Sequence, residues 1–374
     1  MFRVLLLILS GGLAVAQQGD SELLQKAIAL HQSGDYPGAI DAYQKFLSAN
    51  PAQAGVRSNL GAALAHQGRF EEAMREYNSA LNAEPANSKA RFNLAIAEYK
   101  TGRIGSAAKD LERVHEAEPG NRQATLLLAE CDLRIGAYKK AIELLDQPGV
   151  AVDSDLAVAY LMGTALIRDG QIERGQPLID RIFKNGDSAE ARLLLGCSEL
   201  MVHDFKAAQV NITRAVELNP ELPQAHSYLG LTLLRMGDMA AAEKAFRAEL
   251  KLDPNNFDAN LQLGGILRQD QHQEEARGML ERALSVRPGD FATRYQLAAI
   301  DLEQNRVAEA RTALEKLVKE APAFVQAHVS LAAAYYREKR KEDGDREREI
   351  IRKLNAEAQE KQPGVKEGAA SDSK

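Results

Sequence analysis

The sequence predicts an all-α fold, an α-solenoid built from about ten helix-turn-helix repeats. Two series of small residues support this prediction. Steps of 34 residues from Gly61, and likewise from Ala73, meet only Gly or Ala along the chain, with one 33-residue step at the same place in both series. Seven Pro residues fall in the same phase: Pro51, Pro85, Pro119, Pro220, Pro254, Pro288 and Pro322. A fixed period of this length is typical of repeat architectures, in which stacked neighbours share one continuous core.

Each repeat is expected to hold two antiparallel helices. In the stretch GRFEEAMREYNSALNAEP, Gly68 sits where a first helix ends and Pro85 prevents the second helix from running on. Helices that cross within about 8–10 Å leave room only for Gly or Ala at the contact, which accounts for both small-residue series. We therefore predict that a larger side chain at Gly61 or Ala73 pushes the helix pair apart.

The composition favours helix and restricts function. Hydrophobic residues make up 45% of the chain and aromatic residues only 5%, so Ala and Leu must supply most of the core. The net charge of -6, without a clustered basic face, argues against a nucleic-acid surface. The seven His residues show no metal-ligand spacing and there is no phosphate-binding loop. We therefore expect no metal, no cofactor and no catalysis.

The two cysteines, Cys131 and Cys197, are expected to be small apolar residues of separate first helices. One intervening helix of the same layer would separate them by roughly 20 Å, which is too far for a disulfide. Reactive thiols are the alternative interpretation.

Residues 1–16 have the pattern of a signal peptide. Arg3 precedes a short apolar run, and Ala14-Val15-Ala16 is the small-x-small arrangement that a signal peptidase accepts. Cleavage is expected after Ala16, which predicts a periplasmic or secreted protein without an integral membrane span in the mature chain. The run is shorter than the roughly 20 apolar residues that cross a bilayer, so an uncleaved anchor is the weaker alternative.

The repeats are predicted to occupy residues 17–336, with starts near 20, 54, 88, 122, 156, 189, 223, 257, 291 and 325. The densely charged residues 337–361 are expected to form a helix that caps the end of the stack, and 362–374 are expected to be disordered. Gln147-Pro148-Gly149, Gly175 and Pro177 interrupt two second helices, so irregular packing is expected between residues 146 and 188.

The repeat pattern resembles that of the tetratricopeptide repeat family. In the second repeat the match consists of Leu60, Gly61, Leu64, Ala73, Tyr77, Ala80 and Pro85. The resemblance implies a right-handed superhelix whose first helices line a concave surface that binds extended peptides or partner helices. One departure is that the large aromatic residue expected early in each first helix is replaced by polar residues: Arg57, Arg91, Arg192, His226, Asn260, Arg294 and His328.

The resemblance implies a set of candidate binding residues on the concave surface: Asn59, Phe92, Asn93, Tyr99, Leu126, Tyr160, Leu193, Leu231, Leu261 and Tyr295. Asn59 and Asn93 match the inward asparagine ladder of O-linked N-acetylglucosamine transferases. The apolar members could instead pack between neighbouring helices. The carboxylate clamp of chaperone-binding members is not matched, because Leu24 and Ile28 occupy two of its positions.

These features together predict an exported scaffold, without catalysis, that binds proteins or extended peptides. The second interpretation is a structural assembly factor of a cell-envelope, secretion or pilus complex that contacts folded partners. An enzymatic role ranks third.

Overall fold

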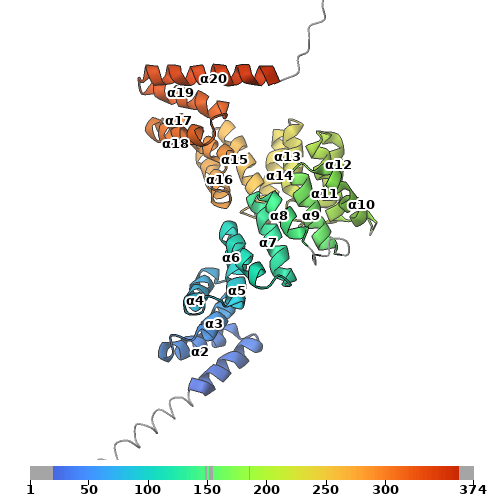
Figure 1. Ribbon diagram of the computed structural model, residues 1–374, viewed down its shortest axis with the longest axis vertical. Coiled ribbons are helices and arrows are strands. Elements are labelled where there is room, and N and C mark those ends of the chain that lie inside the picture. Colours follow the sequence, from blue (N-terminus) through green and yellow to red (C-terminus); the bar gives the residue numbers. More distant parts are fainter. Residues whose placement is uncertain (1–19, 148–149, 151–154, 185, 362–374) are drawn as a thin grey trace, which may run out of the picture. The chain divides into compact units, whose positions relative to one another are not determined.

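The computed structural model describes residues 20–147, 150, 155–184 and 186–361 (Figure 1). Within these residues every regular element is a helix, and the helices form an all-α solenoid. The predicted signal peptide 1–16 and the predicted disordered tail 362–374 lie outside the described residues.

The helices alternate between the first and the second helix of each repeat. A helical segment over 20–32 is followed by α2 (Tyr36–Ala49), α3 (Ala54–His66), α4 (Phe70–Ala83), α5 (Ser88–Lys100), α6 (Ile104–Ala117), α7 (Arg122–Ile135), α8 (Tyr138–Leu145), α9 (Leu156–Arg168), α10 (Ile172–Phe183), α11 (Ala189–Met201), α12 (Phe205–Leu218), α13 (Ala225–Arg235), α14 (Met239–Leu252), α15 (Phe257–Gln269), α16 (Gln273–Val286), α17 (Phe291–Glu303), α18 (Val307–Glu320), α19 (Val325–Arg337) and α20 (Lys341–Lys361). The odd-numbered helices are first helices and the even-numbered helices are second helices.

The chain divides into two compact units, Met1–Thr232 and Leu233–Lys374, with the boundary inside α13. In unit 1 a first helix packs against the second helix of its own repeat and is followed by the next pair, as α3, α4 and α5 do. First helices also contact the next first helix, as α7 does with α9 and α9 with α11. Unit 2 repeats this arrangement, with α15 against α16 and α17, and α19 against α20.

Close packing inside a pair depends on the small residues. Ala73 on α4 is 0% exposed and Tyr77 is 2% exposed, and both belong to the core of the N-terminal repeats. A Cβ atom added at Gly61 would lie 2.7 Å from Cε1 of the Tyr77 ring. Glycine at this position therefore lets the tyrosine ring lie directly on the backbone of α3.

The turns between repeats follow from Pro and from short polar side chains. After Pro85 ends the preceding repeat, the Asn87 side chain accepts a hydrogen bond from the backbone N–H of Ala90 at 2.9 Å and so caps α5. Asn121, Asn256 and Asp290 stand at the same repeat position and cap α7, α15 and α17 in the same way.

The turns inside repeats use the left-handed backbone conformation. Gly68 and Gly136 have φ of 73° and 80° just after their first helices. His203, Gln271 and Asn305 occupy the same position in later repeats and also have positive φ, at 65°, 64° and 60°. The left-handed turn therefore occurs at this repeat position even where the residue is not glycine.

The fourth and fifth repeats are irregular in their second helices. The helix α8 has 8 residues, whereas α6 has 14. The helix α10 contains Pro177 and has Gly175 buried against Ile167. Pro148 and Gly149 lie outside the described residues. Because α9 still contacts α8, α10 and α11, the stack continues through this region.

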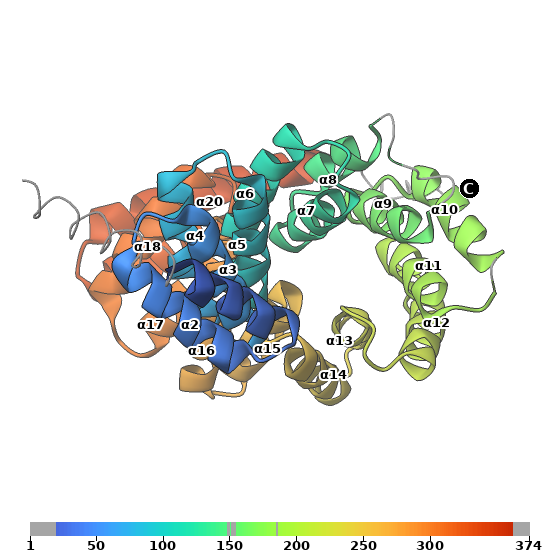
Figure 2. The same ribbon diagram turned by 90° about the horizontal axis from the view of Figure 1, so that it is seen from below.

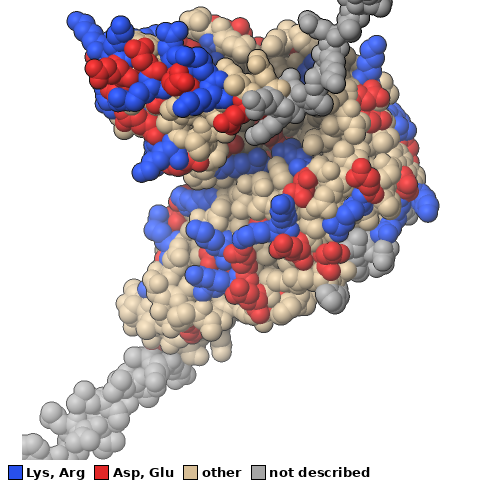
Figure 3. Space-filling view, turned by 45° about the horizontal axis from the view of Figure 1, so that its top comes forward, with Lys and Arg blue, Asp and Glu red and all other residues tan. Residues whose placement is uncertain are grey.

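The C-terminal helix α20 has 21 residues and packs on α19. Acidic and basic side chains mix densely at this end of the chain, at the upper left of Figure 3. On its packed side, Glu347 of α20 lies 2.6 Å from Nδ1 of His328, which is 3% exposed. A charged surface with one buried polar contact suits a helix that ends a repeat stack.

Candidate functional site: the inner face of the first helices

The inner face of unit 1 consists of the first helices α3, α5, α7, α9 and α11 together with residues 225–232 of α13. Figure 2 shows α7, α9 and α11 on the inner side of the curve of this unit, with α8, α10 and α12 outside them. Direct contacts between consecutive first helices agree with this placement. A partner lying along this face would therefore contact several repeats at once.

The ten predicted binding residues differ in exposure. Nine of them are half-buried, so part of each side chain still reaches the surface after the repeats have packed. Leu193 differs, because it is 1% exposed and packs beside Tyr160, Leu194 and Cys197. Leu193 therefore contributes to packing between α9 and α11, and only the other nine residues can meet a partner.

Asn59 and Asn93 lie on matching stripes of α3 and α5. Residues spaced by three and seven share one face of a helix, which places Asn59 in line with Ala62 and His66, and Asn93 in line with Ile96 and Lys100. Phe92 is the neighbour of Asn93 and is also half-buried. This part of the inner face offers amide groups, small apolar surface and basic side chains.

Tyr99 links α5 to α7 through polar contacts. Its hydroxyl donates a hydrogen bond to the Glu130 carboxylate, and the Arg134 guanidinium lies 5.1 Å from the centre of its ring. Burial, together with the nearby Glu130 carboxylate, raises the pKa of Tyr99 well above its usual range. The tyrosine is thus held as a neutral donor at the inner face.

Arg168 ties α9 to both earlier and later repeats. Its Nη2 donates to the Tyr138 hydroxyl at 2.6 Å and its Nη1 donates to the Tyr228 hydroxyl at 3.0 Å. The guanidinium also lies 5.2 and 5.6 Å from the centres of these two rings. Burial raises the pKa of the nearby Tyr160, which lines the same narrow cleft as Arg168. That cleft holds only about 10 Å³ and is filled by its own side chains.

Tyr99 is one of the predicted residues, but Arg134, Arg168 and the two tyrosine partners of Arg168 are not. A signal for them was present, because the last turn of four consecutive first helices in unit 1 carries a basic residue at one repeat position: His66, Lys100, Arg134 and Arg168. Basic residues at helix C-termini are common because they interact favourably with the helix dipole. The pattern alone therefore does not separate a binding residue from a stabilising one.

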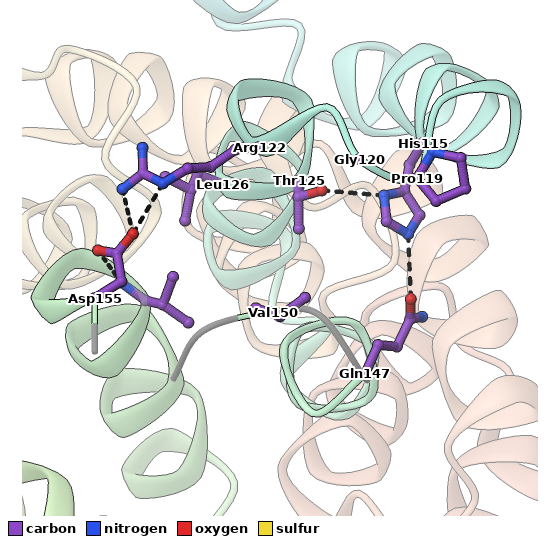
Figure 4. Close-up of a pocket in the computed structure, with 10 residues that line it drawn as sticks. His115, Pro119, Gly120, Arg122, Thr125, Leu126, Gln147, Val150 and Asp155 are labelled. Atoms are coloured by element: carbon purple, nitrogen blue, oxygen red, sulfur yellow. Dashed lines mark hydrogen bonds and ion pairs between the residues drawn. The ribbon is translucent and has the colours of Figure 1, made fainter. Parts of the chain in front are cut away.

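A larger pocket of about 330 Å³ opens beside the N-terminus of α7 (Figure 4). His115 contacts Thr125 through Nδ1 at 3.1 Å and Gln147 through Nε2 at 3.4 Å. On the other side Arg122 pairs with Asp155 at 2.5 Å. Leu126, one of the predicted residues, lines this pocket. Since its polar groups already contact one another, the pocket offers an apolar wall with few available polar partners.

Unit 2 holds the remaining predicted residues, Leu261 on α15 and Tyr295 on α17, and both are half-buried. The Tyr295 ring packs edge-on against Phe324 with ring centres 5.3 Å apart. Its hydroxyl lies 3.5 Å from the Ser330 hydroxyl of α19. Tyr295 therefore both packs between repeats and keeps an accessible edge.

The described residues contain no group of three or more His, Cys, Asp or Glu side chains arranged to hold a metal ion. Cys131 and Cys197 are 0% and 5% exposed, and burial raises the pKa of the Cys131 thiol. These surroundings disfavour a reactive thiolate at Cys131. In the part of the chain that is described, none of the helices combines the length and apolar character needed to cross a membrane.

Comparisons with known proteins identify the repeat. Two tetratricopeptide repeat family models match residues 24–91, 99–161, 193–257, 229–292 and 267–335. The search of curated protein sequences returned no match. Among solved structures, a chain from "Crystal structure of APC/C hetero-tetramer Cut9-Hcn1" is similar over 90% of this chain and 87% of that one, at 11% identity and a TM-score of 0.53. A chain described as "MamA RS-1 ArsTM double mutant" is similar over 46% of this chain and 97% of that one, at 21% identity and a TM-score of 0.42.

The matched ranges cover most of the described repeats and agree with the solenoid of helix pairs seen in both units. Such solenoids are protein-interaction scaffolds, with extended surfaces made by stacked repeats. The chain belongs to the tetratricopeptide repeat family.

Proposed function

We propose that this protein is an exported, non-catalytic scaffold that binds extended segments of other proteins along the inner face of its first helices. The observation that supports this most directly is the partial exposure of apolar and aromatic side chains on that face. Phe92, Leu126 and Leu231 are half-buried and are not among the fully buried residues of the core. Apolar surface that stays accessible is typical of interaction sites when it is contiguous.

The main contribution to affinity is expected from apolar contacts. Burying one large apolar side chain of a partner contributes roughly 1.5–3 kcal/mol, whereas one hydrogen bond to Asn59 or Asn93 contributes about 0.5–1.5 kcal/mol net. Ordering an extended peptide offsets part of this gain. We therefore expect micromolar affinity for a single segment.

Site-specific crosslinking tests the proposed face. A photo-crosslinking amino acid placed at Phe92, Leu126 or Leu231 should capture a bound partner. The matched control position is Val210, which is 67% exposed on the outer helix α12. Capture at Val210 but at none of the three inner positions would show that the inner face is not the binding surface.

The second candidate is a structural assembly factor that contacts folded partners in an envelope, secretion or pilus complex. It is favoured by apolar side chains exposed on α12, where Val210 is 67% and Leu218 is 37% exposed. Crosslinks concentrated on these outer positions would support it. Binding of isolated unstructured peptides at the inner face would count against it.

Export is tested separately from binding. If residues 1–16 are removed as proposed, the mature chain begins at Gln17. Mass spectrometry of the protein from envelope and cytoplasmic fractions should find this N-terminus outside the cytoplasm, and an intact Met1 in the cytoplasm would exclude cleavage.

A further inference from the structure

The inner stripes of α3 and α5 carry basic and amide groups without an acid. On α3 the stripe consists of Gly55, Asn59, Ala62 and His66, and on α5 it consists of Lys89, Asn93, Ile96 and Lys100. In each stripe the members are spaced by four, seven and eleven residues, so they share one face of their helix. None of the eight is buried.

The nearest acidic residue of α5 points elsewhere. Glu98 lies two positions after Ile96, which places it on a different face of the helix. Burial, together with the Asp110 carboxylate of α6, raises the pKa of Glu98 to about 7, and the positive charge of Arg103 opposes this shift. The exposed part of the α5 stripe therefore remains positively charged.

His66, the basic residue of the α3 stripe, lies among other rings of the N-terminal repeats. His66 stacks on Tyr36, with ring centres 4.4 Å apart and planes 5° from parallel. His31 lies 6.1 Å from His66 between ring centres. Burial, with the positive charge of His66 and Lys89, lowers the pKa of His31. The stacking on Tyr36 holds the His66 ring at the C-terminal end of α3. Lys89 and Lys100 are exposed near the two ends of α5.

We propose that the inner face of α3 and α5 binds an acidic, extended peptide segment of a partner protein. This inference rests on the proposed function and names the class of partner. Carboxylate side chains of the segment pair with Lys89, Lys100 and His66, while Asn59 and Asn93 hydrogen-bond to its backbone. Opposite charges at this face favour acidic segments and exclude basic ones.

The geometry also sets the spacing of the acidic residues. The helices α3 and α5 contact each other directly, so their axes lie roughly 10 Å apart. An extended chain advances about 3.3 Å per residue. Acidic residues about three positions apart therefore match the step from His66 to Lys100.

The test compares two labelled peptides by fluorescence anisotropy with the full chain. One is a 12-residue peptide with an amidated C-terminus and Glu at every third position, and its twin carries Gln in place of Glu. The amide removes the terminal carboxylate, so any preference must come from side chains. In low salt we expect the Glu peptide to bind at least about fivefold more tightly than the Gln peptide, and added salt should reduce this difference.

Two charge reversals locate the interaction. Lys100→Glu on α5 should lower the affinity for the Glu peptide by about threefold or more and leave the affinity for the Gln peptide nearly unchanged. Arg113→Glu makes the same change in charge on the outer helix α6, where the Arg113 side chain is 66% exposed, and should affect neither peptide.

The outcomes separate the two proposals. If the Gln peptide binds as well as the Glu peptide, or if Lys100→Glu and Arg113→Glu have equal effects, the acidic-segment proposal is wrong while binding at the inner face stands. If neither peptide binds and inner-face crosslinkers capture nothing, the proposed function fails as well.

Discussion

Arg91 on α5 pairs with Asp110 on α6 at 2.8 Å, and the same guanidinium donates a hydrogen bond to the carbonyl oxygen of Pro85 at 2.8 Å. The two charged side chains are only 14% and 16% exposed. The Pro85 carbonyl belongs to the turn that precedes α5. One arginine therefore connects the two helices of its own repeat with the end of the repeat before it.

The same arrangement recurs at positions where a large aromatic residue was expected. Arg57 pairs with Glu76 and donates to the carbonyl oxygen of Pro51. His328 contacts Glu347 and the Pro322 carbonyl, and the Asn260 side chain donates to the Pro254 carbonyl. The polar residues thus replace aromatic packing with hydrogen bonds between repeats.

We predict that Arg91→Met lowers the free energy of unfolding by about 1–3 kcal/mol, because it leaves Asp110 with little solvent and without its closest cation. Urea denaturation followed by circular dichroism measures this. The matched control is Arg113→Met. The Arg113 side chain is 66% exposed and lies 3.9 Å from the same carboxylate, so it should change stability by less than about 0.5 kcal/mol. Equal losses in the two variants would mean that the close Asp110 pair and the Pro85 contact together add no stability.

Gly61 gives a second prediction, since a Cβ atom there would lie 2.7 Å from the buried Tyr77 ring. Gly61→Ala should cost about 1–3 kcal/mol because the ring must shift in a packed core. Gly55→Ala in the same helix meets no atom within 4 Å and should be neutral or stabilising by up to about 1 kcal/mol, as alanine favours helix. Thermal unfolding of both variants checks this. If Gly61→Ala stabilised the protein instead, the space between α3 and α4 would be large enough for a methyl group.

The period, the helix pairs and the role of Gly61 could be predicted because each depends on residues in a fixed local phase. The left-handed turns after first helices could be predicted where the residue is Gly68 or Gly136. They could not be predicted at His203 or Asn305, where the packing of the repeat imposes positive φ on a residue that does not favour it.

The candidate site was harder to predict, because exposure depends on contacts between repeats that are distant in sequence. Leu193 of α11 has the same repeat position as Phe92 and Tyr160, yet it is buried where α11 packs against α9. Arg168 reaches Tyr228, 60 residues further along the chain, and no pattern within one repeat encodes that contact. The division of the chain inside α13 is likewise a property of the packing as a whole.

Asp132 provides a prediction about pH. Its side chain is 3% exposed, its Oδ1 is buried without a hydrogen-bond partner, and burial raises its pKa to about 7, with Lys140 opposing and Glu112 adding to the shift. The unfolded chain therefore releases this proton at lower pH than the folded chain does. The protonated Asp132 carboxyl therefore favours the folded state. This contribution to the free energy of unfolding is fully present below about pH 4 and is lost as the pH rises toward 7.

Asp132→Asn cannot ionise and should remove this dependence. The free energy of unfolding of the variant minus that of the unmodified chain should rise by on the order of 2–4 kcal/mol from pH 4 to pH 8. The change of side chain itself adds only an offset that does not depend on pH. Urea denaturation at several pH values measures the difference. A difference that stays the same across this range would show that Asp132 is already ionised in the folded protein at low pH.

Pro177 is the sixth residue of α10 and has no backbone N–H to donate to the carbonyl of Glu173. Its side chain is exposed, so Pro177→Ala removes little packing while it restores a helical hydrogen bond. We predict that the variant gains about 1–3 kcal/mol in local stability, since proline inside a helix costs roughly 3 kcal/mol relative to alanine. Hydrogen exchange should show slower exchange in α10 and in the neighbouring α9 and α11, which pack on it.

The control is Pro119→Ala. Pro119 lies in a turn after α6, outside any helix, so this substitution should leave exchange in α10 unchanged. If Pro177→Ala does not slow exchange in α10, the helix is already limited by its buried Gly175 contact with Ile167 rather than by the proline.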